Sequence, residues 1–260
     1  MDDKWRANIQ VLVKKYLMAR TMGSKKNISI RPTSEDRFIG VWVKRHPRTL
    51  KNQVGRSEHN NLDLIAADII DKLRITEYDK VLDVCCGNGL ITKLISKKCK
   101  VIYAVDFSKI LIATAKKDNN AQNIHYCLGD ALNISKYFPK NFFDKSYCYF
   151  SFQHFDFERG PLLVDALQKV TKCECSILIG DIPDLSRIWS YYNTPLKKSI
   201  FLMDSVWHRV RRKGQCSLGW WWHPDQLKEI CNKLNLNCVV LKQEKKLPHS
   251  YYRFDILIRR

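Results

Sequence analysis

The chain has 260 residues and a formal net charge of +19, a length that suits one α/β domain with an extension. No apolar run approaches the roughly 20 residues of a membrane-spanning helix, and the start, MDDKWRANIQ, does not have a signal-peptide pattern. The ten cysteines are scattered, and several lie in apolar runs, so we expect reduced thiols in a cytoplasmic protein without a metal site.

The positive charge is concentrated toward the two ends of the chain. Residues 1–60 carry 14 Lys/Arg against 5 Asp/Glu, residues 61–181 carry 16 against 15, and residues 182–260 carry 15 against 6. Flanking segments of an α/β fold cover the carboxyl ends of the strands, where ligands bind. The charge therefore favours an anionic substrate, and a solvated basic surface is the alternative.

Residues 1–60 are predicted to form a basic extension or lid. Residues 4–20 place apolar side chains on one helical face, which favours packing on the chain's own domain over a membrane or a partner. Gln53 and Arg56 directly precede a helix predicted over 62–73. We expect these two side chains near the substrate or a cofactor carboxylate, with an ordinary surface loop as the alternative.

A strand, a glycine turn and a helix are predicted over residues 80–98. The run VLDV at 81–84 has the length and β-branched character of a buried strand, and CCGNG at 85–89 ends it. Such a turn brings backbone N–H groups close to a ligand, because glycine has no Cβ to block the approach. A second strand near 100–105 leads into Asp106, where a ribose would present its hydroxyls. The pair predicts a nucleoside cofactor.

Strands and helices continue to alternate, which indicates a Rossmann-like, mostly parallel sheet with helices on both faces in residues 61–260. Strands are expected near 123–128, 143–149 and 174–181, and helices near 108–119 and 160–172. The aromatic and basic stretch 182–222 is interpreted as an insertion that covers the substrate. A helix from Pro224 to about Leu234 and two strands, near 237–241 and 251–258, complete the chain.

The stretch KVLDVCCGNGLIT at 80–92 resembles motif I of class I S-adenosylmethionine-dependent methyltransferases, D-x-G-x-G-x-G. Asp83, Gly87 and Gly89 match it, and Cys85 stands where the family usually has its first glycine. Because cysteine is small, we expect the turn to be kept with a slightly narrower methionine pocket. The dinucleotide pattern G-x-G-x-x-G is not met.

Three further segments resemble the family in the same order. They are VDFS at 105–108 for the ribose, GDA at 129–131 for the adenine, and FDKSYCYFSFQHF at 143–155 beside the methyl group. The resemblance implies a seven-stranded sheet with an antiparallel last strand and S-adenosylmethionine as cofactor. The cofactor-binding residues it implies are Asp83, Cys85, Gly87, Gly89, Asp106, Phe107, Asp130, Ala131 and Phe150.

Catalytic and substrate candidates lie on the loops of the same domain. His154 follows the fourth strand and is the expected general base. Asp181 ends the fifth strand and could orient His154 or the acceptor, and His223 is a second candidate base. Arg253, next to Tyr252, is expected to bind an anionic group of the substrate together with Gln53 and Arg56. The structural alternatives are a loop anchor, a salt bridge and a strand-edge contact.

The CCGNG turn, the SFQHF loop and the ending YYRFDILI resemble small bacterial methyltransferases that modify sugars of surface polysaccharides. This implies carbohydrate biosynthesis and O-methylation of a small anionic acceptor, such as a sugar or a phosphate-bearing saccharide. RNA or another nucleic acid is the alternative acceptor, favoured by the charge and by the aromatic stretch 182–222. A non-catalytic S-adenosylmethionine-binding module is a third reading, which the intact acids and glycines of the motifs disfavour.

Overall fold

The computed structural model describes residues 61–210 and 219–259, with side chains described to residue 203 in the first range. The chain divides into two units, Met1–Arg37 and Phe38–Arg260, and all described residues belong to the second. The helix predicted over 4–20, the two substrate candidates Gln53 and Arg56, and the proposed lid at 1–60 lie outside the described residues.

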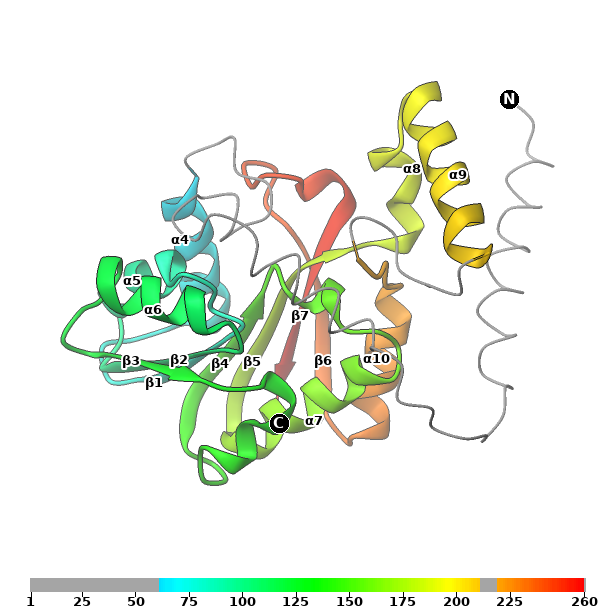
Figure 1. The fold of residues 1–260 in the computed structure, drawn as a ribbon. Helices are drawn as coiled ribbons and strands as arrows, with labels where there is room; N and C mark the ends of the chain where they lie inside the picture. Colours follow the sequence, from blue (N-terminus) through cyan, green and yellow to red (C-terminus); the bar gives the residue numbers. More distant parts are fainter. Residues whose placement is uncertain (1–60, 211–218, 260) are drawn as a thin grey trace. The chain divides into compact units, whose positions relative to one another are not determined.

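The centre of the fold is one seven-stranded sheet in the order β3-β2-β1-β4-β5-β7-β6 (Figure 1). The strands β1 to β5 pair in parallel, and β7 runs antiparallel between β5 and β6. This confirms the predicted Rossmann-like sheet with an antiparallel last strand. The strand bounds are β1 (Lys80–Val84), β2 (Val101–Asp106), β3 (Ile124–Leu128), β4 (Phe143–Tyr149), β5 (Thr171–Pro183), β6 (Asn237–Lys242) and β7 (Arg253–Arg259).

Helices pack on both faces of the sheet (Figure 1). The helices α4 (Leu62–Leu73), α5 (Leu90–Ser96) and α6 (Lys109–Asp118) contribute to one buried cluster, and α7 (Arg159–Val170) and α10 (Pro224–Lys233) to the other. Side chains of β1 alternate between them: Val81 joins the first cluster, and Leu82 and Val84 join the second. Apolar residues therefore occur on both faces of β1, because both of its faces are covered.

The stretch 182–222 contains helices that the sequence interpretation did not place. A short η3 (Leu185–Arg187) leads into α8 (Ile188–Tyr191) and α9 (Pro195–Val210). The Asp184 carboxylate caps η3 by accepting a hydrogen bond from the Ser186 amide at 2.9 Å. Tyr192, Trp221 and Tyr252 then form a third buried cluster, which joins the insertion to the start of β7.

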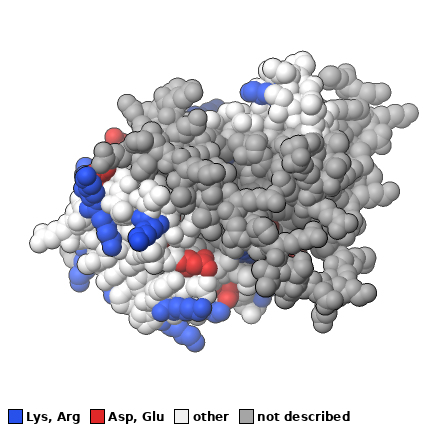
Figure 2. All heavy atoms as spheres, viewed as in Figure 1, with Lys and Arg blue, Asp and Glu red and all other residues white. Residues whose placement is uncertain are grey.

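Charged side chains are unevenly distributed on the described surface, even in residues 61–181, whose net charge is close to zero. Figure 2 shows Lys and Arg side chains over the side of the domain that carries α5 and α6. The exposed lysines there are Lys97, Lys98, Lys109, Lys116 and Lys117. Within the described ranges, no helix is long and apolar enough to cross a membrane, and the cysteines are free thiols.

Candidate cofactor and acceptor site

The turn after β1 has a left-handed backbone at three positions. The φ angles are 61° at Cys85, 58° at Gly87 and 79° at Gly89. At Gly89 a Cβ would also lie 2.3 Å from the Tyr126 hydroxyl oxygen, so only glycine fits. Position 85 carries cysteine in place of glycine. The Cys85 backbone therefore has a conformation that residues with a side chain rarely adopt.

The Asp106 carboxylate is fixed at the tip of β2, directly beside this turn. It accepts hydrogen bonds from the amide of Gly87 at 2.9 Å and from the amide of Ser108 at 2.8 Å. The residue is only 6% exposed, and burial raises the pKa of its carboxyl group. The structure therefore brings Asp106 and the glycine turn together, as a nucleoside site requires.

Asp83 lies in the interior, below the turn. Its carboxylate accepts a hydrogen bond of 2.6 Å from the Thr92 hydroxyl of α5, which links β1 to that helix. Burial raises the pKa of Asp83 to about 7, and the Thr92 hydrogen bond opposes that rise. Asp83 thus supports the turn through the start of α5, and its predicted role in cofactor binding stays a prediction.

Cys85 packs against the buried cluster of α7 and α10. A hydrogen bond with Cys148 of β4, together with burial, raises the pKa of the Cys85 thiol well above its ordinary value. Cys148 lies opposite Val84 in the pairing of β1 with β4. The thiol therefore acts as a small apolar residue that joins two strand ends.

The residues expected around the adenine follow β2 and β3. Phe107 is 39% exposed next to the buried Asp106, which leaves an aromatic surface open beside the carboxylate. Asp130 accepts hydrogen bonds from the Leu132 amide at 2.9 Å and the Asn133 side chain at 2.6 Å, and so caps η1 (Ala131–Lys136). Ala131 is buried in the core cluster.

The loop after β4 is held by neighbouring segments on two sides. Phe150 has φ 64°, and its amide donates to the Gly180 carbonyl at 3.2 Å. His154 ends η2 (Phe152–His154), and the preceding Gln153 accepts a 2.7 Å hydrogen bond from the Trp220 amide. The insertion is thereby joined to the loop that carries the expected base.

Asp181 and Arg253 form a buried ion pair at the carboxyl end of β5. Arg253, which is 0% exposed, donates to the Asp181 carboxylate and to its carbonyl oxygen. Asp181 has φ 57° where the pairing of β5 with β7 shifts register between Ile179 and Ile182. The structure therefore gives Asp181 a guanidinium partner, and its predicted role in orienting His154 or the acceptor stays a prediction.

His223 and Tyr252, two other candidate site residues, make contacts that stabilise the fold. His223 is the N-cap of α10: its Nδ1 accepts from the Asp225 amide at 3.3 Å, and its own amide donates to the Gln226 side chain at 2.8 Å. Tyr252 is fully buried and stacks near Trp221 and Tyr191 at centroid distances of 5.6 and 4.9 Å. These contacts account for both residues structurally, and their functional roles stay predictions.

Residues 81–174 match a family model described as a methyltransferase domain. Residues 81–174 therefore carry a methyltransferase domain. This confirms the predicted family and, through it, S-adenosylmethionine as the cofactor.

Curated relatives of the methyltransferase domain match over part of their length. A "Probable cobalt-precorrin-6B C(15)-methyltransferase (decarboxylating)" of Methanococcus vannielii is 41% identical over 80 residues, which is 30% of this chain and 44% of that protein. A "Probable ribosomal RNA small subunit methyltransferase A" of Thermococcus sibiricus is 29% identical over 114 residues, 38% of this chain and 40% of that protein. The chain thus spans less than half the length of both relatives.

Solved structures share the fold of the methyltransferase domain over more of the chain. A structure described as the DhpI-SAM-HEP complex has a TM-score of 0.60 at 14% identity, covering 89% of this chain and 100% of that one. The N-methyltransferase NodS of Bradyrhizobium japonicum, in complex with S-adenosyl-L-homocysteine, has a TM-score of 0.58 at 13% identity, covering 86% and 97%. At these identities the likeness concerns the fold.

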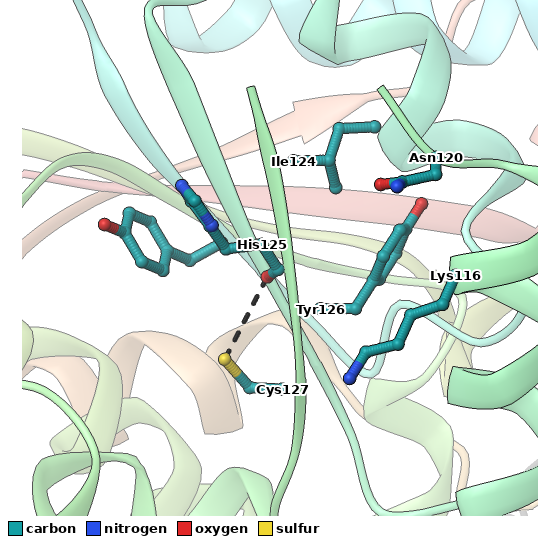
Figure 3. A pocket seen from close by; sticks show the side chains of 7 residues that line it. Lys116, Asn120, Ile124, His125, Tyr126 and Cys127 are labelled. Carbon is teal, nitrogen blue, oxygen red and sulfur yellow. Dashed lines mark hydrogen bonds between the residues drawn. The ribbon is translucent and has the colours of Figure 1, made fainter. Parts of the chain in front are cut away.

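A hollow of ≈ 570 Å³ lies at the open edge of β3 (Figure 3). Figure 3 shows Lys116 and Asn120 on one side of the strand and His125 on the other. None of the predicted site residues of the methyltransferase domain lines it; the lining residues are Tyr103, Lys116, Asn120, Ile124, His125, Tyr126 and Cys127. Because the hollow straddles an edge strand, we assign it no part in the site.

Proposed function

We propose that this protein transfers a methyl group from S-adenosylmethionine to an oxygen atom of a small anionic acceptor, such as a sugar or a phosphate-bearing saccharide. The observation that carries the proposal is the Asp106 carboxylate, fixed beside Gly87 by two amide hydrogen bonds. A fixed acid at the second strand tip suits ribose hydroxyls, and the exposed ring of Phe107 beside it suits a purine face.

The residues that would hold the cofactor come from three strand ends: Cys85, Gly87 and Gly89 after β1, Asp106 and Phe107 after β2, and Asp130 and Ala131 after β3. The amide of Gly129 donates to the Asp106 carbonyl at 3.0 Å, which ties the second and third of these ends together. When bound, S-adenosylmethionine supplies an electrophilic methyl group. The chain's own contribution is then to orient that group and to exclude water around it.

Two residues support an anionic acceptor that reacts through oxygen. Arg253 uses one nitrogen for Asp181, while its Nε and second terminal nitrogen have no hydrogen-bond partner among the described residues. A planar guanidinium of this kind suits a carboxylate or phosphate. His154, after β4, is the candidate base that takes the hydroxyl proton, a contribution of roughly 10²–10⁴-fold when it operates.

RNA is the second candidate acceptor. Four of the curated relatives are named as ribosomal RNA small subunit methyltransferase A, and they match over 27–38% of this chain. The exposed lysines that follow α5 and lie on α6 suit phosphate contacts. Against RNA stands the loop SFQHF, which lacks the Pro-Pro pair of enzymes that methylate exocyclic base amines.

Two measurements test the proposal in sequence. Calorimetry with S-adenosylhomocysteine first tests whether the chain binds the cofactor product, which an enzyme and a non-catalytic S-adenosylmethionine-binding module would both do. Transfer of a labelled methyl group is then compared among sugar phosphates, nucleotide sugars and structured RNA. Labelling of RNA alone would replace the saccharide proposal with the RNA one, and failure to bind S-adenosylhomocysteine would refute both.

A further inference from the structure

A buried network of charged and polar side chains joins α4 to the carboxyl end of β5. Lys72 lies 2.5 Å from both Asp68 and Asp255, and the Tyr149 hydroxyl donates to Asp68 at 3.1 Å. Asp255 also accepts a hydrogen bond from the Asp181 amide at 2.7 Å. The network therefore fixes the left-handed backbone of Asp181, and with it the ion pair to Arg253.

Gln243 lies at the centre of this network, directly after β6. Its side-chain nitrogen is 2.9 Å from the Asp255 carboxylate, 3.3 Å from the Tyr149 hydroxyl and 3.4 Å from the Asp181 carboxylate. Because two of these neighbours are carboxylates, which only accept hydrogen bonds, the amide nitrogen must face them. The amide oxygen Oε1 must then point away from both acids.

Gln243 and Arg253 both have hydrogen-bonding atoms without a partner in the described part of the chain. Gln243 is 7% exposed and Arg253 is 0% exposed. Gln243 Oε1 and the Nε and second terminal nitrogen of Arg253 have no partner in the described part of the chain. Buried polar atoms in native proteins are almost always paired, so this acceptor and these two donors, on two side chains that both hydrogen-bond to Asp181, call for partners of their own.

We propose that Gln243 and Arg253 together bind the end of the methyl acceptor, and that they select a group with an anionic oxygen next to a hydroxyl. Arg253 donates to the anionic oxygen, and Gln243 Oε1 accepts from the hydroxyl. This inference rests on the proposed function and narrows its substrate class to hydroxylated anions, such as sugar phosphates and sugar acids.

The chemistry of the two residues explains why both features are needed. A simple anion fills the Arg253 donors and leaves Gln243 Oε1 without a donor, whereas a neutral polyol leaves the guanidinium without its anion. Leaving a buried polar atom unpaired costs about 1–3 kcal/mol, which corresponds to at least roughly fivefold in affinity. A hydroxylated anion, which pairs with both Arg253 and Gln243, should therefore bind more tightly than a simple anion or a neutral polyol.

The test uses the full chain saturated with S-adenosylhomocysteine and three probes, glucose 6-phosphate, glucose and inorganic phosphate. Calorimetry is expected to show glucose 6-phosphate binding at least fivefold tighter than either of the other probes. Gln243→Met should abolish this advantage over phosphate while leaving the affinity for phosphate within twofold. The matched control Gln168→Met, on α7, should behave as the wild type.

A second variant separates recognition from folding. In Gln243→Glu the new carboxyl faces Asp181 and Asp255, so it stays protonated at pH 5.5 and keeps both an acceptor oxygen and a donor. This variant should retain the preference for glucose 6-phosphate at that pH, whereas Gln243→Met should not. Melting temperatures and S-adenosylhomocysteine affinities establish that both variants are folded.

The outcomes distinguish this inference from the proposed function. Equal binding of glucose 6-phosphate by wild type and Gln243→Met overturns the inference, because Oε1 would then be filled by water. Failure of the loaded wild type to prefer glucose 6-phosphate overturns it as well. In either case an unchanged affinity for S-adenosylhomocysteine leaves the methyltransferase proposal standing, whereas loss of that affinity in the wild type refutes the methyltransferase proposal itself.

Discussion

The amide of Gly87 donates a 2.9 Å hydrogen bond to the carboxylate of Asp106, 19 residues further along the chain. The same turn is attached a second time, by the Cys86 amide to the Val105 carbonyl at 3.1 Å. The glycine turn and the tip of β2 thus form one rigid unit. A ligand that lies between them meets groups already in place, so little ordering opposes its binding.

Asp106→Asn should weaken the binding of S-adenosylhomocysteine by at least tenfold, or about 1.4 kcal/mol. The asparagine amide would face the donors of Gly87 and Ser108, so one of the two supporting hydrogen bonds is lost along with the charge. Calorimetry gives the affinity, and Asp118→Asn on the exposed side of α6 is the control. Equal affinities in the two variants would show that Asp106 does not contact the cofactor.

Substitutions at Cys85 should separate backbone strain from side-chain size. Cys85→Gly is expected to bind S-adenosylhomocysteine at least as well as the wild type, since glycine adopts φ 61° without strain. Cys85→Val should lose at least about 2 kcal/mol of stability, because a β-branched residue is an outlier there. Chemical denaturation and calorimetry measure both effects. A stable valine variant with normal affinity would contradict the observed backbone.

Asp83 should make the stability of the domain depend on pH. Its pKa is about 7 in the folded chain against 3.8 when unfolded, so between pH 4 and pH 7 only the folded state holds the proton. The unfolding free energy therefore falls as the pH rises through this range, by at most about 4 kcal/mol from this residue. Urea denaturation from pH 4.5 to 7.5 should show a smaller fall for Asp83→Asn. Parallel curves for the two proteins would exclude a raised pKa.

His154→Ala should report on the atom that is methylated. With a hydroxyl acceptor, kcat is expected to fall by roughly 10²–10⁴-fold, because the hydroxyl proton loses the general base that would accept it. With an amine acceptor the fall should be small. His125→Ala, at the edge of β3, serves as the control, and S-adenosylhomocysteine affinity should be unchanged in both. A normal kcat with a proven hydroxyl acceptor would remove His154 from the mechanism.

Much of the fold could be predicted because its signals are local. The strand β1 begins and ends where the apolar run indicates, at Lys80 and Val84, and α4 spans the predicted residues 62–73. The helix α9 was missed even though Pro195 stands at its start and Leu196, Ile200 and Met203 recur at helical spacing. The aromatic and basic composition of this stretch favours a binding loop, whereas the spacing of its apolar residues indicates a helix.

The site was predicted less completely, because its acceptor side depends on contacts between distant segments. Gln243 lies 62 residues from Asp181 and 94 from Tyr149, and no short motif surrounds it. At His223, by contrast, the neighbouring residues in the sequence already indicate the structural role. Proline directly after it and glutamine three residues on are typical of a capping box, and they indicate a helix start before any catalytic role.

The position of β7 also sets an order of events during synthesis. Because β7 lies between β5 and β6, the strand β6 leaves the ribosome before its neighbour in the sheet exists. Until then Lys72 lacks its partner Asp255, and Asp181 lacks its partner Arg253. A nascent chain halted after β6 should therefore have an incomplete sheet that proteases cleave. The domain should become resistant to proteolysis only once β7 has emerged.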